Sequence, residues 1–284
     1  MKTLTLSADD LPLSQRRTED LPGHWLLARL GKRVLRPGGK QTTRWLLDHV
    51  HIEDADVVEL APGLGRTASE IVSRSPRSYI GVDEEPKAAA LVTRVVSPAG
   101  GRCIQARAQQ TELADASADV IVGEAMLTMQ TNRGKAAIIS EAARVLRPGG
   151  RYAIHELGLE PEGIDPQLAE SIRKDLARAI KVNARPLTIA EWTALLAESG
   201  FRVESTYRAP MALLELRRNL ADEGLLRVLR IAWRVLRDPA ARRRVLGMRR
   251  VFVTYREHMS GVGIIAVREE TTEVDPRLST RKGE

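Results

Sequence analysis

The segment VVELAPGLGRTA, residues 57–68, joins a short apolar run to a glycine-rich turn and the start of a helix-forming stretch. Glycine has no Cβ, so such a turn allows ligand atoms to approach the backbone. The helix that follows presents free N–H groups and a partial positive charge at its N-terminus. Asp83 ends the next apolar run, 18 positions after Gly65, where a carboxylate can accept hydrogen bonds from both hydroxyls of a ribose. The segment therefore predicts a site for a cofactor that contains adenosine.

Two cofactors fit this pattern. Gly63, Gly65 and Ala68 match G-x-G-x-x-A, the fingerprint of dinucleotide binding. Glu59, however, precedes Gly63 by four residues, and a carboxylate beside the loop hinders the binding of pyrophosphate. S-adenosylmethionine carries no phosphate but has an α-amino group and a sulfonium, which a nearby acid favours. The pattern favours S-adenosylmethionine over NAD, and an ordinary strand-to-helix turn without a ligand is the remaining alternative.

Short apolar runs alternate with helix-forming stretches along the middle of the chain. This alternation predicts βαβ units, and the near-continuous apolar character of the runs predicts a parallel sheet covered on both faces. Helices are expected on either side of this region, at 24–34, 40–50, 165–182 and 188–200. Strands are expected at 56–61, 78–83, 101–106, 118–125, 151–157, 201–215 and 258–269.

The segment ARVLRPGGR, residues 143–151, precedes the fifth expected strand. Its proline stops a helix and its two glycines turn the chain back into the sheet. This motif follows ELAPGLG, GVD and ADVIVGEAM in order and precedes LTIAEWTALLAESGF. Together they resemble the class I (Rossmann-like) S-adenosylmethionine-dependent methyltransferases of small-molecule type. The resemblance covers roughly residues 50–201 and the last strand.

The resemblance implies an α/β fold, a Rossmann-like, doubly wound, seven-stranded and mostly parallel sheet. An N-terminal helical arm precedes this sheet, and a helical insertion separates strands six and seven. We expect a tail and helical arm over residues 1–50, a methyltransferase domain over 51–269 with a helical cap at 216–256, and a polar tail over 270–284.

The resemblance also assigns roles to individual residues. Glu59, Ala61, Gly63 and Gly65 would line the methionine half of S-adenosylmethionine. Asp83, with Glu84 beside it, would hold the ribose, and Arg107 and Ala108 would flank the adenine. Glu124 would lie near the sulfonium and methyl group, and Glu124 and His155 are the catalytic candidates, with His155 as a general base or, alternatively, a buried structural histidine. Glu156 alternates to the opposite face of the strand from His155.

Two positions depart from the family pattern. Ala61 replaces the first glycine, which is compatible with a negative φ at that residue. Arg107 stands where many members carry an aspartate that accepts the adenine amino group, and an arginine cannot accept a hydrogen bond. Adenine recognition would then depend on the backbone, on Ala108 or on a stacking contact.

The basic character of the chain is concentrated in the expected cap. The net charge is +7, yet residues 216–250 hold eleven arginines against three acidic residues, a local balance of +8, so the remainder sums to −1. Both ends of this insertion meet the edge of the sheet where the cofactor is expected. We therefore predict a cap that binds an anionic substrate through Arg230 and Arg234. A solvated amphipathic surface, a membrane-surface helix at 225–237 and a nucleic-acid contact are the alternatives.

Composition excludes several classes of protein. The single Cys103 forbids a disulfide within the chain, the histidines lack metal-binding spacing, and no run reaches the about 18 apolar residues of a membrane span. With few aromatic residues and no Asn-Pro-Pro-aromatic motif at 123–126, nucleic acid is a poor candidate partner. We predict a cytoplasmic methyltransferase that acts on a small molecule. The alternatives are a non-catalytic binding protein of the same fold, an NAD-dependent oxidoreductase, and a lipid or nucleic-acid methyltransferase.

Overall fold

A computed structural model describes residues 11–33, 36–211 and 223–270. It contains one seven-stranded sheet with the strand order β3-β2-β1-β4-β5-β7-β6. β1 to β5 pair in parallel, whereas β7 lies antiparallel between β5 and β6. The predicted doubly wound, mostly parallel sheet is therefore confirmed. Its strands are β1 (Asp56–Leu60), β2 (Ser78–Asp83), β3 (Arg102–Gln105), β4 (Ala118–Glu124), β5 (Leu146–Leu159), β6 (Phe201–Pro210) and β7 (Met259–Arg268).

Helices cover both faces of this sheet, and alternation along each strand decides which side chain meets which layer. In β1, Val57 packs towards α2, α3 and α4, whereas Val58 packs towards α5 and α7. The helices of the two layers are α2 (Gly39–His49), α3 (Arg66–Val72), α4 (Pro86–Val96), α5 (Asn132–Val145) and α7 (Ile189–Ala197). Short 3₁₀ turns, η1 (Thr18–Asp20), η2 (Ser97–Ala99) and η3 (Leu127–Met129), complete these connections.

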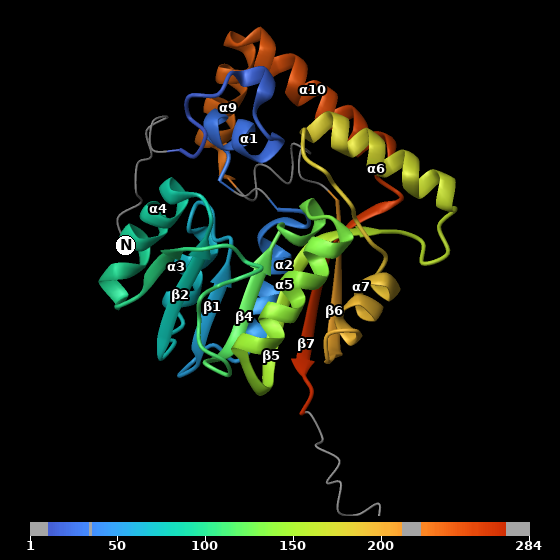
Figure 1. Cartoon of the computed structure of the whole chain (residues 1–284). Coiled ribbons are helices and arrows are strands. Elements are labelled where there is room, and N and C mark those ends of the chain that lie inside the picture. Colours follow the sequence, from blue (N-terminus) through green and yellow to red (C-terminus); the bar gives the residue numbers. More distant parts are fainter. Residues whose placement is uncertain (1–10, 34–35, 212–222, 271–284) are drawn as a thin grey trace, which may run out of the picture.

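A third cluster of helices stands apart from the sheet, beyond the carboxyl ends of its parallel strands (Figure 1). We call it the cap. Its helices are α1 (Gly23–Leu30), α6 (Pro166–Ile180), α9 (Leu225–Arg237) and α10 (Pro239–Thr254). Their apolar residues form a separate core with the end of β5 and with Met211 and Met259. The helical insertion between β6 and β7 is thus present, and it joins the N-terminal arm and α6 in one layer.

The sequence placed several boundaries wrongly. The first helix ends at Leu30 instead of residue 34, because Gly31 adopts the left-handed conformation (φ 104°) that closes the helix. The residues before it are not a loose tail from residue 11 onward, since Leu11 and Leu21 are buried. β5 begins at Leu146, inside the LRPGG motif, with an irregular register against β4. Parts of the expected tails, of strand 201–215 and of the cap (1–10, 212–222 and 271–284) lie outside the described residues.

The N-terminal arm lies directly against β7. A Cβ placed on Gly261 would meet the backbone nitrogen of Gly38 at 2.5 Å and the carbonyl carbon of Pro37 at 2.7 Å. Both atoms belong to backbone, so neither can rotate away. Glycine at 261 is therefore what allows the turn before α2 to pack on the sheet.

This contact predicts the effect of a single methyl group. Gly261→Ala should lower the free energy of unfolding by about 1–3 kcal/mol, because overpacking forces the arm away from β7. Urea unfolding measures the change. Gly163→Ala, whose Cβ would meet nothing within 4 Å, is the matched control and should alter stability by less than about 0.5 kcal/mol. Equal stability of the two variants would show that the arm does not depend on this close approach.

Candidate active site

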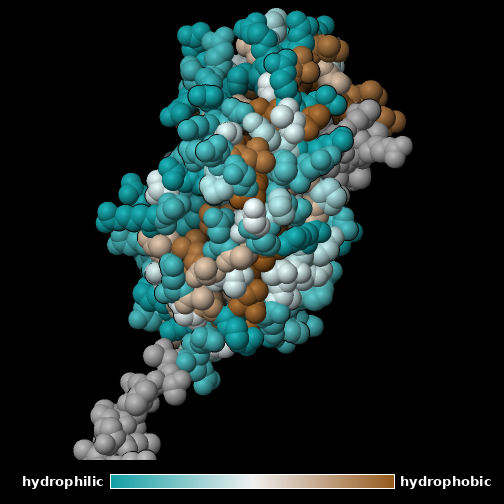
Figure 2. Space-filling model, turned by 90° about the vertical axis from the view of Figure 1, so that its right-hand side faces the viewer, coloured by the Kyte–Doolittle hydropathy of each residue, from teal (hydrophilic) through white to brown (hydrophobic). Residues whose placement is uncertain are grey.

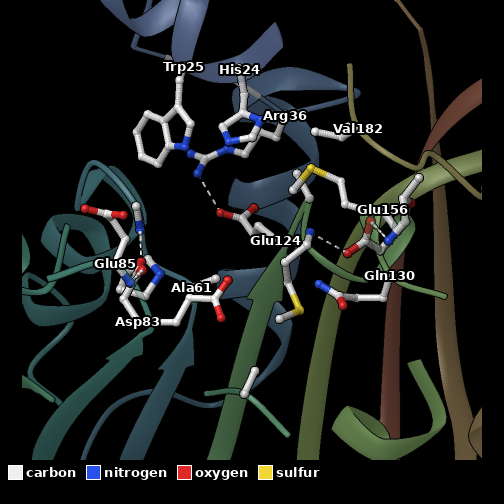
Figure 3. A pocket seen from close by; sticks show the side chains of 18 of the residues that line it. His24, Trp25, Arg36, Ala61, Asp83, Glu85, Glu124, Gln130, Glu156 and Val182 are labelled. Carbon is white, nitrogen blue, oxygen red and sulfur yellow. Dashed lines mark hydrogen bonds and ion pairs between the residues drawn. The ribbon is translucent and has the colours of Figure 1, made fainter. Parts of the chain in front are cut away.

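A large cavity lies between the sheet and the cap, with a volume of about 1100 Å³. Figure 3 shows Asp83 and Glu85 at one end and Gln130, Glu156 and Val182 at the other. Glu124 lies between these ends, below His24, Trp25 and Arg36. The volume stands at the upper limit of the roughly 300–1,000 Å³ typical of ligand sites, so it offers room for two small molecules. In α/β sheets ligands bind outside the carboxyl ends of the strands, and this cavity occupies that place.

The glycine-rich turn forms one wall of the cavity. Gly63 (φ 55°) and Gly65 (φ 68°) both adopt the left-handed conformation, and Gly65 caps the N-terminus of α3. Ala61 also lies in this region, with φ 52°, so the negative φ that would make its methyl group tolerable is not present. A non-glycine residue there costs about 1–2 kcal/mol, because its Cβ approaches the neighbouring carbonyl. The turn keeps its shape despite this cost, since the Ala61 N–H donates to the carbonyl of Val82 on β2 (2.8 Å).

Asp83 closes the other side of this turn. One of its carboxylate oxygens accepts the N–H of Gly63 (3.1 Å) and the other accepts the N–H of Glu85 (3.0 Å). Burial raises the pKa of Asp83, while these two backbone donors oppose the rise. Glu84, Arg107 and Ala108 line the same end of the cavity. All residues expected around the adenosine therefore face one space.

Glu59 lies at the base of the cavity and is almost fully buried. Tyr79 of β2 donates its hydroxyl to the Glu59 carboxylate (2.6 Å). Burial raises the pKa of Glu59 to about 8, with the neighbouring carboxylates of Glu124 and Asp83 adding to the rise. At neutral pH this side chain holds a proton, and an ammonium group placed beside it would favour its ionised form.

Glu124, at the end of β4, is the centre of a buried polar network. Its carboxylate accepts hydrogen bonds from Arg36 Nη1 (2.6 Å), from Thr43 Oγ1 (2.6 Å) and from the hydroxyl of Thr67. His155 Nδ1 lies 2.8 Å from the same carboxylate. Burial alone would raise the pKa of Glu124, but the Arg36 charge and these hydrogen bonds lower it to about 2. Glu124 is therefore a permanent anion at the middle of the cavity.

His155 has no free ring nitrogen. Its Nδ1 faces the Glu124 carboxylate, and its Nε2 faces the backbone carbonyl of Pro37, so each ring nitrogen already has a partner within the protein. The ring is fully buried and is not part of the cavity wall. This geometry suits a residue that positions Glu124 and does not support a general base at His155.

Glu156 points to the opposite face, as the alternation along the strand predicted. Its carboxylate accepts the backbone N–H groups of Met126 (2.8 Å), Leu127 (2.6 Å) and Thr128 (3.0 Å). Burial raises its pKa, although these donors act in the opposite direction. Glu156 lines the cavity and fixes the start of η3.

Comparison with known proteins agrees with this arrangement. A family model described as a methyltransferase domain matches residues 58–154, the part of the chain that carries the glycine turn, Asp83 and Glu124. An uncharacterised protein of Haemophilus influenzae is 33% identical over 254 residues, which cover 88% of this chain and 98% of that protein. The chain belongs to the class I S-adenosylmethionine-dependent methyltransferases.

Solved structures share the fold of this methyltransferase. A putative sarcosine dimethylglycine methyltransferase from Galdieria sulphuraria superposes with a TM-score of 0.65 at 18% identity, over 81% of this chain and 86% of that one. The geranyl diphosphate C-methyltransferase of Streptomyces coelicolor A3(2) gives 0.60 at 16% identity, over 81% and 78%. MccD protein gives 0.64 at 18% identity, over 82% and 99%. At these identities the likeness concerns the fold alone.

The cap of the methyltransferase reaches the cavity with apolar side chains. Met248 and Phe252 of α10 line it, whereas Arg230 and Arg234 are not among the lining residues. Arg234 Nη1 instead points to the backbone carbonyl of Arg29 on α1 (3.4 Å). Substrate binding by Arg230 and Arg234 stays a prediction, and it would require an acceptor that extends beyond the cavity wall. Within the described residues, no helix is long and apolar enough to cross a membrane.

Sequence reasoning missed the contribution of the N-terminal arm. His24, Trp25, Arg33 and Arg36 all line the cavity, although more than twenty residues separate them from the glycine-rich turn. Burial lowers the pKa of His24 to about 4, so its ring is neutral at physiological pH. The LRPGG motif at 35–39 marks a turn at Arg36, but an arginine before Pro-Gly-Gly is equally suited to an exposed turn, so the motif alone does not assign it to the cavity.

The raised pKa of Glu59 predicts a pH-dependent stability. The unfolded chain loses this proton near pH 4.5, whereas the folded chain keeps it until about pH 8, so the free energy of unfolding falls across this window. Glu59→Gln cannot ionise and still accepts the Tyr79 hydroxyl. The variant should be within about 1 kcal/mol of the wild type near pH 5 and should exceed it by about 4 kcal/mol at pH 8.5. Urea unfolding at several pH values measures this difference.

The exposed Glu53 supplies the control, since Glu53→Gln should follow the wild-type profile at every pH. Parallel profiles for Glu59→Gln and wild type would mean that Glu59 is ionised in the folded protein throughout.

Proposed function

We propose that this methyltransferase transfers the methyl group of S-adenosylmethionine to a small molecule that has an apolar body and an anionic group. The observation that carries the proposal is one cavity whose two walls differ in chemistry. Its polar wall is formed by the glycine turn and Asp83 at the sheet, and its apolar wall by the cap. Methyl transfer requires a donor and an acceptor in contact in a dry space, and one continuous cavity under a cap meets that requirement.

The polar wall suits the cofactor. Asp83 is placed to accept the ribose hydroxyls after releasing one of its backbone donors, and the turn at Arg107 and Ala108 bounds the adenine. The methionine half would lie along Gly63 and Gly65, with its ammonium group beside Glu59. S-adenosylmethionine supplies an electrophilic methyl group on a sulfonium. The permanent negative charge of Glu124, between the two ends of the cavity, favours a cation there.

Arg36 is placed to bind a carboxylate in this space. One of its nitrogens bonds Glu124, but its buried Nε and Nη2 atoms have no hydrogen-bond partner among the described residues. A buried donor without a partner is costly, and an anionic ligand group would satisfy both atoms at once. We assign these donors to the carboxylate of the methionine half.

The apolar wall, on the side of the cap, suits the body of the acceptor. Trp25 of α1, Leu176 and Ile180 of α6, and Met248 and Phe252 of α10 line it. Such a wall excludes water and contributes roughly 25 cal/mol for each Å² of apolar acceptor surface that it buries. His24 adds a neutral ring that can accept a hydrogen bond from an acceptor hydroxyl or amine.

Arginines at the rim favour an anionic group on the acceptor. Arg33 and Arg66 line the cavity, and burial together with the nearby charges of Arg227, Arg66 and Arg230 lowers the pKa of Arg33, while the Glu223 carboxylate opposes the shift. Cations held this close together gain when an anion binds between them. The geranyl diphosphate methyltransferase of the same fold acts on a molecule with an apolar chain and a diphosphate, which is the same combination.

The cofactor assignment predicts the effect of removing one carboxylate. Asp83→Ala should weaken the binding of S-adenosylhomocysteine by about 1.5–3 kcal/mol, a tenfold or greater loss, because hydrogen bonds to a charged group are lost. Isothermal titration calorimetry measures this affinity. Asp48→Ala, which removes an exposed carboxylate of α2, is the control and should bind as the wild type does.

Two results would contradict the assignment. Binding of NAD without binding of S-adenosylhomocysteine would support an oxidoreductase, and binding of neither would support a protein that has lost turnover. Transfer of a labelled methyl group to metabolites of differing polarity then identifies the acceptor.

The acceptor assignment predicts that an arginine at the rim of the cavity affects the KM of the acceptor, whereas an arginine on the outer surface of the cap does not. With an acceptor identified in that way, Arg33→Gln should raise its KM about tenfold and leave S-adenosylhomocysteine affinity within about twofold, because a charge-assisted contact to the acceptor is lost. Arg250→Gln, an exposed change on α10 outside the cavity wall, is the control and should leave KM unchanged. A rise in KM with Arg230→Gln and Arg234→Gln, but not with Arg33→Gln, would move the anionic group outward to α9.

A further inference from the structure

The outer surface of the cap is unusually apolar. Among the described residues, every large hydrophobic side chain that is strongly exposed belongs to α9 or α10, with exposed fractions between 43% and 81%. Figure 2 shows hydrophobic surface at the upper end of the molecule, where the cap lies. These residues are Leu225, Leu226, Leu229, Trp233, Leu236, Leu246 and Val253, and we call them the outer apolar face.

The side chains of α9 divide into three arcs, at about 100° per residue. Ile231 and Val235 point inward and pack with α1, α6 and α10. The five residues of the outer apolar face on α9 span about 100° of the circumference and contact solvent. Between these two arcs lie the four arginines Arg227, Arg230, Arg234 and Arg237. The helix therefore has one apolar arc more than its packing against the described residues uses.

The outer side of α10 continues this pattern. Leu246 and Val253 are exposed among Arg242, Arg243, Arg249 and Arg250. The two helices together contain nine arginines and neither aspartate nor glutamate. Arg237 stacks on the exposed Trp233 ring, 4.0 Å from its centroid, which places an aromatic ring and a cation side by side.

We propose that α9 and α10 dock the methyltransferase on an anionic lipid bilayer, with α9 lying in the plane of the interface. Leucine and tryptophan on one arc beside arginines on the next is the arrangement by which a helix enters the boundary between headgroups and acyl chains. The outer apolar face inserts among the acyl chains, and the arginines contact acidic headgroups.

The positive charge of this surface distinguishes an anionic bilayer from a second copy of the chain and from a nucleic acid. A second copy of the chain, meeting this surface about a twofold axis, would bring the same arginines against one another, and α9 and α10 themselves contain no acidic residue to separate them. A nucleic acid would satisfy the arginines but would leave the leucines in water. An anionic bilayer provides acyl chains for the outer apolar face and acidic headgroups for the arginines.

Vesicle sedimentation with the full chain tests the proposal. Wild-type protein should bind vesicles of phosphatidylcholine with phosphatidylglycerol at least about tenfold more tightly than vesicles of phosphatidylcholine alone, and salt should weaken that binding. Leu229→Gln combined with Trp233→Gln should lower binding at least about tenfold, because the buried apolar area is lost. Arg230→Gln combined with Arg237→Gln should lower it to a similar degree for anionic vesicles only.

Lys174→Gln combined with Arg178→Gln is the matched control. It removes two exposed cations from α6, which lacks an outer apolar arc, and should change binding by less than about twofold. Thermal unfolding and S-adenosylhomocysteine affinity should be the same for all three variants, since every substituted side chain is largely exposed and none lines the cavity. The cofactor assignment can therefore fail without affecting this test.

Three outcomes would overturn the proposal. Wild-type protein that binds no vesicle, or that binds neutral and anionic vesicles equally, excludes an anionic bilayer as the partner. Equal loss of binding in the Lys174/Arg178 control would show attraction by net charge alone. A dimer in analytical ultracentrifugation that Leu229→Gln with Trp233→Gln dissociates, without vesicle binding by the wild type, would assign the outer apolar face to a second copy.

Discussion

The buried charge of Glu124 is the constraint on which the site depends. A carboxylate removed from water is costly unless a cation and hydrogen-bond donors surround it. Here Arg36 supplies the cation, and Thr43 of α2, Thr67 of α3 and His155 of β5 complete the set. Each donor comes from a different element. The turn before α2, the helices α2 and α3, and the strands β4 and β5 must therefore meet at Glu124.

The same network explains why the N-terminal arm belongs to the site. The turn at Arg36 and Pro37 gives a side chain to Glu124 and a carbonyl to His155, and Gly261 of β7 leaves room for its backbone. Once this turn is fixed, α1 lies over the cavity with Trp25 and His24. Two contacts thus hold the N-terminal arm in the cavity wall. One is the ion pair between Arg36 and Glu124, and the other is the close backbone packing of the turn on Gly261.

The insertion between β6 and β7 serves a different requirement. Both of its ends must return to the edge of the sheet that carries the cavity, so its helices can only lie above that edge. Their inner apolar residues complete the core of the cap, and Met248 and Phe252 reach the cavity. Their outer residues repeat the apolar pattern without a partner among the described residues, so the cap has an apolar surface on its outer side as well as on its inner side.

Sequence patterns predicted most of the fold, because strand and helix periods are local properties. β1 and β2 begin where expected, and the mostly parallel sheet follows from the alternation of strands and helices. Asp83 and Glu124 could be assigned to the cavity because strand ends in such a sheet meet at one edge. Predicted element boundaries were wrong where a single backbone angle set the boundary, as at Gly31. The sign of φ at Ala61 could not be predicted from the residue type.

The sequence alone determined the architecture, the family and the residues at the strand ends. Only the tertiary structure decided the environment of each side chain. It placed both ring nitrogens of His155 against acceptors, brought Arg36 to Glu124 across 88 positions of sequence, and turned the arginines of α9 away from the cavity while Phe252 faces it. The physical reason is that periodicity depends on neighbours a few residues apart, whereas charge pairing, burial and orientation depend on atoms that folding brings together from distant segments.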